Sequence, residues 1–96
     1  MEEAQHIIDE WVRKGDVTQW LDLTHLGLTS LPPLPEELTK LDCDRNQLTE
    51  ILDLPEGLTT LSCRYNELAS LLSLPEGLTH LYCKGNKLSS LPPLPE

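Results

Sequence analysis

Three cysteines, Cys43, Cys63 and Cys83, have the widest chemical range in this sequence, since a thiolate can act as a nucleophile, a metal ligand or a disulfide partner. Their spacing favours none of these roles. An odd number does not close a set of disulfides. A zinc site would need CxxC or Cys/His pairs at ligand spacing, and the three histidines stand in no such relation to the cysteines. We therefore expect reduced thiols that are buried and bind no ligand.

Other catalytic signatures are missing from the sequence as well. It contains no glycine-rich phosphate loop, no nucleophile elbow and no HExxH motif. The sequence therefore predicts neither an enzyme nor a cofactor.

The cysteines lie in a repeat of twenty residues, seen in LTKLDCDRNQL, LTTLSCRYNEL and LTHLYCKGNKL. Leucines and prolines recur at matching offsets through repeats at 38–57, 58–77 and 78–96, and a degenerate repeat covers 18–37. Self-similarity at a short, fixed period predicts a solenoid, because one such unit cannot bury a core alone.

Each repeat contains a strand signal, a turn signal and a proline-rich segment. Apolar and polar residues alternate around the cysteine, which predicts a short, half-buried strand, and stacked copies predict a parallel sheet. An asparagine follows at 46, 66 and 86, where its amide can bond backbone groups as the strand turns. The first repeat has Leu26 there, and we expect its turn to be less regular. The prolines that follow exclude a helix and predict an extended return.

The pattern L-x-x-L-x-C-x-x-N-x-L, joined to LPxLP, resembles the leucine-rich repeat at the short end of its length range. It is most similar to the repeat domains of bacterial effectors, among them the enteric effector ubiquitin ligases. The resemblance covers residues 18–96 and implies an α/β solenoid with a parallel sheet on its concave face, extended convex returns and a protein partner. The ligase domain of those effectors has no counterpart here, so their activity is not carried over.

Residues 1–15 differ from the repeats and have the pattern of an amphipathic helix. Its apolar residues fall on one helical stripe: Ala4, Ile7, Ile8, Trp11 and Val12. Acidic residues at the start and basic ones at the end suit the helix dipole, and Gly15 is placed to end the helix. We expect a cap over the first repeat. A membrane-surface helix is disfavoured because the polar face is not rich in lysine.

Composition is that of one small soluble domain of 96 residues. The net charge of -9 argues against a nucleic-acid partner, which needs a basic face. No stretch is long and apolar enough to span a bilayer and no signal peptide opens the sequence, so we expect no membrane partner. The localisation stays unknown, with an intracellular or recombinant origin favoured over secretion.

A binding function would depend on the polar positions of the concave sheet face, where the charged side chains change from acidic to basic along the array. The candidate residues are Trp20, Asp22, Lys40, Asp42, Asp44, Arg64, His80, Tyr82 and Lys84. Tyrosine and arginine are typical anchors of protein interfaces. The alternative is a solvated face with cross-strand charge pairs.

Two other features predict self-association, most simply as a dimer. Leucine replaces proline in the returns of the two middle repeats, which predicts an apolar strip unless these leucines enter the core. The sequence also stops within a repeat, with no polar capping unit over its last strand. The candidate residues for self-association are Leu52, Leu72, Leu88, Leu91 and Leu94.

Two functions remain. The first is a non-catalytic scaffold for protein–protein interaction, engineered or truncated, that forms a homo-oligomer through its uncapped end. The second is a natural recognition module of a bacterial effector, with a protein partner on the concave face.

Overall fold

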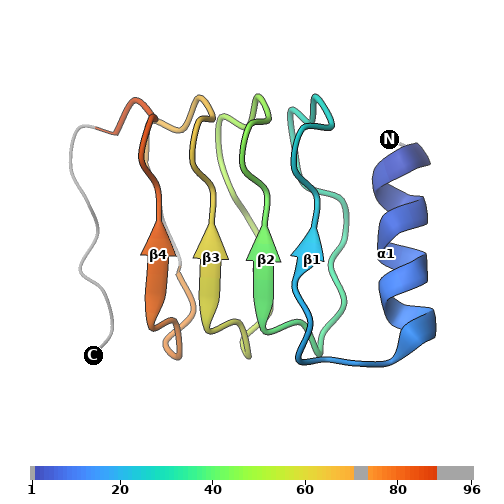
Figure 1. Cartoon of the computed structure of the whole chain (residues 1–96). Helices are drawn as coiled ribbons and strands as arrows, with labels where there is room; N and C mark the ends of the chain where they lie inside the picture. The colour runs from blue at the N-terminus through green and yellow to red at the C-terminus, as the bar shows by residue number, and fades with distance from the viewer. Residues whose placement is uncertain (1, 71–73, 89–96) are drawn as a thin grey trace.

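The computed structural model describes residues 2–70 and 74–88. Its elements are one helix and four strands: α1 (Glu2–Lys14), β1 (Leu21–Asp22), β2 (Lys40–Asp42), β3 (Thr60–Ser62) and β4 (His80–Tyr82). The strands form one parallel sheet in the order β1-β2-β3-β4, and α1 stands beside β1 at one edge (Figure 1). The predicted solenoid, with its parallel sheet and extended returns, is confirmed.

The sheet register follows the sequence repeat. Leu21 pairs with Leu41, Leu41 with Leu61, and Leu61 with Leu81, a shift of one repeat at each step. The first three of these leucines are fully buried. A leucine column that points inward from every strand gives the stack its common core, since apolar area leaves water at each step.

Two of the three cysteines lie in this core. Cys43 and Cys63 are buried free thiols, and burial raises the pKa of Cys63 to about 12. Neither is therefore a nucleophile near neutral pH. The prediction of full burial is wrong for Cys83, which is half-buried, because it follows β4, the last strand of the described sheet, and no described strand covers its outer side.

The asparagines close the turns by bonding the backbone of two repeats at once. The Asn46 amide nitrogen donates to the carbonyl oxygens of Leu23 and Cys43, at 2.9 and 3.0 Å. Its side-chain oxygen accepts from the backbone nitrogens of Leu26 and Leu28, each at 3.0 Å. The predicted role of the amide is confirmed, and each asparagine also completes the turn of the preceding repeat.

The turn of the first repeat is regular, and the prediction about Leu26 is wrong. His25 has φ 61°, as Arg45 and Tyr65 have φ 60° in the next two turns. The reason is that Asn46 of the second repeat supplies the acceptor for Leu26. An asparagine within the first repeat is therefore not needed for this conformation.

Helix α1 packs on the first repeat. Ala4 and Ile8 are buried in the core cluster, and Ile7 and Trp11 are partly buried against it. Val12 does not belong to this contact face, because 55% of its surface is exposed. The apolar stripe predicted from the sequence thus includes one residue, Val12, that does not pack against the first repeat.

The end of α1 is held by backbone and side-chain bonds. The Gly15 nitrogen donates to the Trp11 carbonyl at 3.3 Å, and Gly15 takes φ 73°, which suits glycine at a helix end. The Trp11 indole nitrogen donates to the Gln19 carbonyl at 3.1 Å, which ties the helix to the segment before β1. No helix among the described residues is long and apolar enough to cross a membrane.

Candidate protein-binding surface

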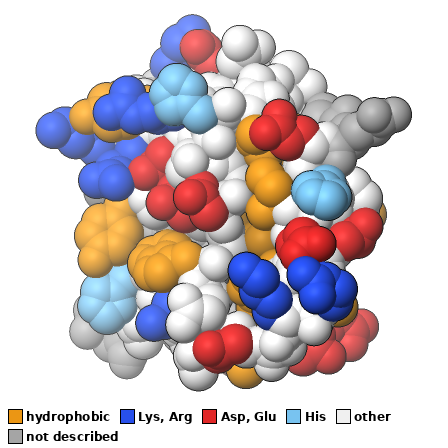
Figure 2. All heavy atoms as spheres, turned by 45° about the vertical axis from the view of Figure 1, so that its right-hand side comes forward, with side chains coloured by type: hydrophobic (Ala, Val, Ile, Leu, Met, Phe, Trp, Pro, Cys, Tyr) orange, Lys and Arg blue, Asp and Glu red, His pale blue; other side chains and the backbone are white. Residues whose placement is uncertain are grey.

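The polar positions of the four strands form rows across the sheet face. One row is Asp22, Asp42, Ser62 and Tyr82, which the register places side by side. A second row contains Lys40, Thr60 and His80. In Figure 2 this face occupies the left half of the view, with acidic side chains at its middle, basic ones mainly above them, and hydrophobic and histidine side chains both above and below.

Two carboxylates of like charge lie next to each other at the middle of the face. Asp22 is exposed and Asp42 is half-buried, on neighbouring strands. Asp22 Oδ1 accepts from the Thr24 nitrogen and hydroxyl at 3.0 and 2.7 Å, and Asp42 Oδ1 accepts from the Asp44 nitrogen at 3.2 Å. Burial raises the pKa of Asp42, and the charges of Asp44 and Asp22 add to that rise. No cation neutralises this pair among the ion pairs of the described residues.

Asp44 is only 6% exposed, so the prediction that it occupies an outward position of this surface is wrong. Its Oδ1 accepts from the Ser62 hydroxyl and the Arg64 nitrogen, each at 2.7 Å. Its Oδ2 accepts from Arg64 Nε and Nη2 at 3.1 and 2.9 Å. Burial alone would raise the pKa of Asp44, but these hydrogen bonds outweigh it and hold the pKa below its usual range. Asp44 therefore fixes the position of Arg64.

Exposed aromatic side chains share this face with the acidic pair. Trp20 is 43% exposed next to β1, and Tyr82 is 45% exposed on β4. The rings of His80 and Tyr82 are stacked, with centroids 6.4 Å apart. Half-exposed aromatic rings on a rigid sheet can bury large area at low entropic cost when a partner binds.

A groove of about 320 Å³ lies between α1 and β1 and continues this surface. Ile7, Trp11 and Leu21 form its apolar part, and Trp20 and Asp22 stand at the sheet side. In Figure 2 it follows the vertical line of hydrophobic atoms to the right of the centre. The helix thus covers the core and also widens the surface around Trp20.

Sequence reasoning missed a stack along the turns above the sheet. The Arg45 guanidinium lies over the Tyr65 ring, 4.6 Å from its centroid. The same ring covers Gly85, where an added Cβ would lie 2.5 Å from Tyr65 Cδ1. All three residues occupy one column of the repeat and have positive φ. The signal in the sequence was the glycine at 85, in a column that holds side chains in the other repeats.

The structure describes some of the remaining candidate residues and not others. Lys84 is exposed, and its carbonyl accepts from the Tyr65 nitrogen at 2.8 Å. Leu52 is 57% exposed, whereas Leu88 is half-buried and packs against the core. Leu72, Leu91 and Leu94 lie outside the described residues. Within the described ranges, no group of three His, Cys, Asp or Glu side chains could hold a metal ion.

Comparison with solved structures shows which class of protein has this architecture. YopM from Yersinia enterocolitica WA-314 matches 95% of the chain with a TM-score of 0.85 and 36% identity. A Shigella effector leucine-rich-repeat domain matches 98% of it with a TM-score of 0.76 and 30% identity. No protein-family profile matches the sequence, and no curated protein is significantly similar to it.

The fold and these matches show a leucine-rich-repeat protein. Its repeats are of the kind found in bacterial effectors, as the sequence pattern predicted. The chain spans about 20% of the YopM chain and 51% of the Shigella chain.

Proposed function

We propose that this chain is a non-catalytic protein-interaction module and that its sheet face, next to α1, binds another protein. The observation that carries the proposal is the acidic pair Asp22 and Asp42, which makes no ion pair among the described residues and shares its sheet face with the exposed rings of Trp20 and Tyr82. Likeness to the repeat domains of bacterial effectors supports a partner that is a protein.

The charge and shape of the face favour a partner with a cationic side chain near its centre. A lysine or arginine placed over the acidic pair would relieve the like-charge contact and exchange its own hydration for charge-assisted hydrogen bonds. The aromatic rings would bury their exposed faces around that contact. Such an interface would have aromatic anchors, which protein interfaces favour, around one desolvated pair of opposite charges.

The test is affinity purification with three baits: the unmodified chain, the double variant Trp20→Ser/Tyr82→Ser and the control Val12→Ser. Val12 has a comparable exposure on α1 but lies away from the sheet. Quantitative mass spectrometry should find proteins that the chain and the control retain and the double variant loses. Equal retention by all three baits would contradict a role for the sheet face.

Self-association and an engineered or truncated origin stay predictions. The exposure of Leu52 supports an apolar contact on the return side. Light scattering after gel filtration tests the assembly, with Leu52→Lys and Leu91→Lys as the variants that should lower the mass. A monomer at about 100 μM would contradict a specific homodimer, since specific interfaces assemble at micromolar concentrations or below.

A further inference from the structure

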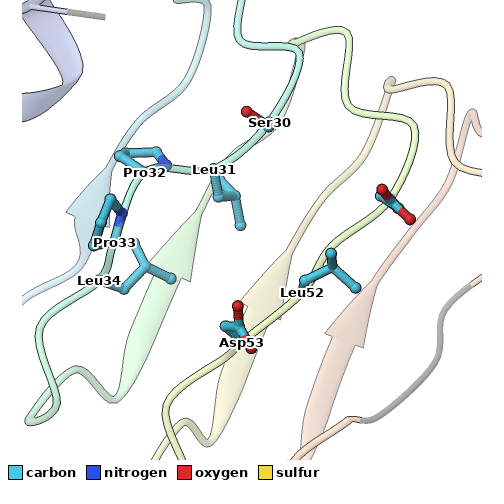
Figure 3. A pocket seen from close by; sticks show the side chains of 8 residues that line it. Ser30, Leu31, Pro32, Pro33, Leu34, Leu52 and Asp53 are labelled. Carbon is cyan, nitrogen blue, oxygen red and sulfur yellow. The ribbon is translucent and has the colours of Figure 1, made fainter.

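A second groove lies on the other side of the solenoid, between the returns of the first and second repeats. It has a volume of about 410 Å³, within the range of ligand and peptide sites. Figure 3 shows Leu31, Pro32, Pro33 and Leu34 on one return and Leu52 and Asp53 on the next, on the two sides of the space that these residues line. Ser30 and Glu50 complete the lining. The groove is therefore separate from the sheet face.

The groove exists because the two returns differ in conformation. Asp53 has φ 60°. The matching residue of the first repeat is Pro33, whose ring holds φ near about -65°. Aspartate tolerates the left-handed region better than most side chains. Two stacked returns with different backbone paths cannot pack as one continuous layer, so a hollow is left between them.

The same difference brings one leucine out of the core. Ile51 is 4% exposed and Leu54 is partly buried, whereas Leu52 between them is 57% exposed at the groove. The first repeat has Pro32 in its place. A large aliphatic side chain held in water on a rigid surface costs free energy that a bound partner recovers.

The charge around this groove has a single sign. The returns at 29–39 and 49–59 contain five carboxylates and no basic residue: Glu36, Glu37, Glu50, Asp53 and Glu56. The ion pairs of the described residues involve none of these five. All seven lysines and arginines of the sequence lie outside the returns: Arg13, Lys14, Lys40, Arg45, Arg64, Lys84 and Lys87.

From this apolar groove with an acidic rim we infer a docking site for a cationic peptide segment of a partner protein, in which leucine-like side chains are flanked by lysine or arginine. The apolar side chains would contact Leu31, Pro33 and Leu52, and the basic ones would lie against Glu50 and Asp53. A groove surrounded only by negative charges repels nucleic acid and anionic lipid and attracts such a segment. A second copy that presented its own return side would bring the same sign of charge, so the acidic rim favours a cationic segment over the self-contact that the apolar Leu52 alone would allow.

Fluorescence anisotropy with a labelled, amidated peptide that places a Leu-Leu pair between two Lys-Lys pairs tests this site. We expect a dissociation constant of about 10–100 μM, since the groove is small compared with a standard protein interface. Binding should weaken several-fold between about 0.05 and 0.5 M NaCl, because salt screens the exposed charges. The same peptide with glutamate in place of lysine should not bind.

Variants of the chain locate the contact. Leu52→Ser should weaken binding by about tenfold, the loss expected for one large apolar contact. Glu50→Gln/Asp53→Asn keeps the shape, because asparagine also tolerates positive φ, and should weaken binding several-fold and flatten its salt dependence. Glu56→Gln and Val12→Ser are the controls: a return carboxylate outside the groove lining and an exposed apolar residue on α1. Val12→Ser should leave binding unchanged, and Glu56→Gln should weaken it much less than Glu50→Gln/Asp53→Asn does.

Three results would overturn the inference. Leu52→Ser could bind the peptide as tightly as the unmodified chain. Asp22→Asn/Asp42→Asn could abolish binding while the groove variants keep it, which would place the peptide on the sheet face. Light scattering without peptide could show a dimer that Leu52→Ser dissociates, which would make a second copy the occupant. Thermal unfolding of each variant confirms that it is folded.

Discussion

The turn side of this solenoid, where the asparagines follow the strands, and the return side, formed by the proline-containing segments, tolerate sequence variation differently. On the turn side the same side chain recurs, because the amides of Asn46 and Asn66 bond the backbone of two repeats. On the return side Pro33 of one repeat corresponds to Asp53 of the next, with a backbone angle that proline cannot take. The asparagine column bonds the backbone of the preceding repeat and is constant from the second repeat to the fourth, whereas a segment that only crosses back over the core can vary. Side chains that differ between repeats lie on the returns, on the outward strand positions and in the turn column of Arg45 and Tyr65.

Removing α1 should have the largest effect, because both sides share the core that this helix covers. Ala4 and Ile8 are buried against the first repeat, where Leu21 and Leu23 are 0% exposed. A chain that begins at Asp16 would expose these leucines to water, at a cost of about 1.5–3 kcal/mol for each fully exposed side chain. We expect cooperative unfolding in urea to be lost or the shortened chain to precipitate.

Circular dichroism and tryptophan fluorescence would both follow this unfolding. The control is Val12→Ser, which changes the exposed side of the same helix and should leave the midpoint unchanged. A shortened chain that unfolds with the same midpoint as the full chain would show that the repeats need no helix at this end.

Asn66→Ala should have the second largest effect and separates the turn side from the return side. Asn66 is 6% exposed, and its loss leaves the Leu48 nitrogen without a partner, whereas the Cys43 and Cys63 carbonyls each lose one of two bonds and keep those from Asn46 and Asn86. One unsatisfied buried donor costs about 1–3 kcal/mol and the other lost bonds add about 1 kcal/mol, so we expect a loss of about 2–4 kcal/mol by urea unfolding.

Two matched variants sharpen this prediction. Asn86 makes corresponding bonds but is half-buried, so water can replace part of them and Asn86→Ala should cost less. Leu52→Ser on the return side should cost close to nothing, because Leu52 is mostly exposed. If Leu52→Ser destabilised the chain as much as Asn66→Ala, the contrast between the two sides would fail.

Asp44→Asn should have an intermediate effect that depends on pH. The amide would turn a donor toward Arg64 in place of a carboxylate oxygen, and we expect a loss of about 1–3 kcal/mol at pH 7. Because the folded-state pKa of Asp44 is lowered, its contribution is present above the unfolded-state pKa of about 3.9 and is lost as pH falls through the folded-state value. Urea unfolding of both proteins should therefore converge at acidic pH. A constant difference down to pH 2 would contradict the ionic role.

The fold could be predicted from the sequence wherever a residue's role repeats every twenty positions. The leucine column through Leu41 and the amide of Asn46 are such cases, since each copy has the same neighbours in the repeats on either side. The end of α1 before Gly15 could also be predicted, because a glycine that follows a last helical turn with basic residues commonly ends a helix.

The surface could be predicted only where strand alternation decides it. Alternation correctly placed Asp22 and Asp42 on the sheet face. It failed for Asp44, whose burial depends on Ser62 and Arg64 of the next repeat, a combination that no other repeat contains. The outward position of Leu52 depends on a backbone path that composition does not specify.

Asp42→Asn should have the smallest effect and the opposite sign to Asp44→Asn. Burial raises the pKa of Asp42 in the folded state, so its charge destabilises the fold at pH 7. That penalty is fully present above the folded-state pKa and disappears below the unfolded-state value of about 3.9. The variant should therefore have a slightly higher urea midpoint at pH 7 and the same midpoint as the unmodified chain at acidic pH.

Salt and a second variant show where this gain comes from. Asp22→Asn removes the neighbouring charge and should reproduce part of the gain, and the part due to repulsion should shrink as salt is added. A variant that gains stability but binds the partner of the sheet face more weakly would show that this carboxylate is kept at a cost to the fold. A lower midpoint at pH 7 would instead mean that the bond from the Asp44 nitrogen outweighs burial and repulsion, so Asp42 would support the fold as Asp44 does.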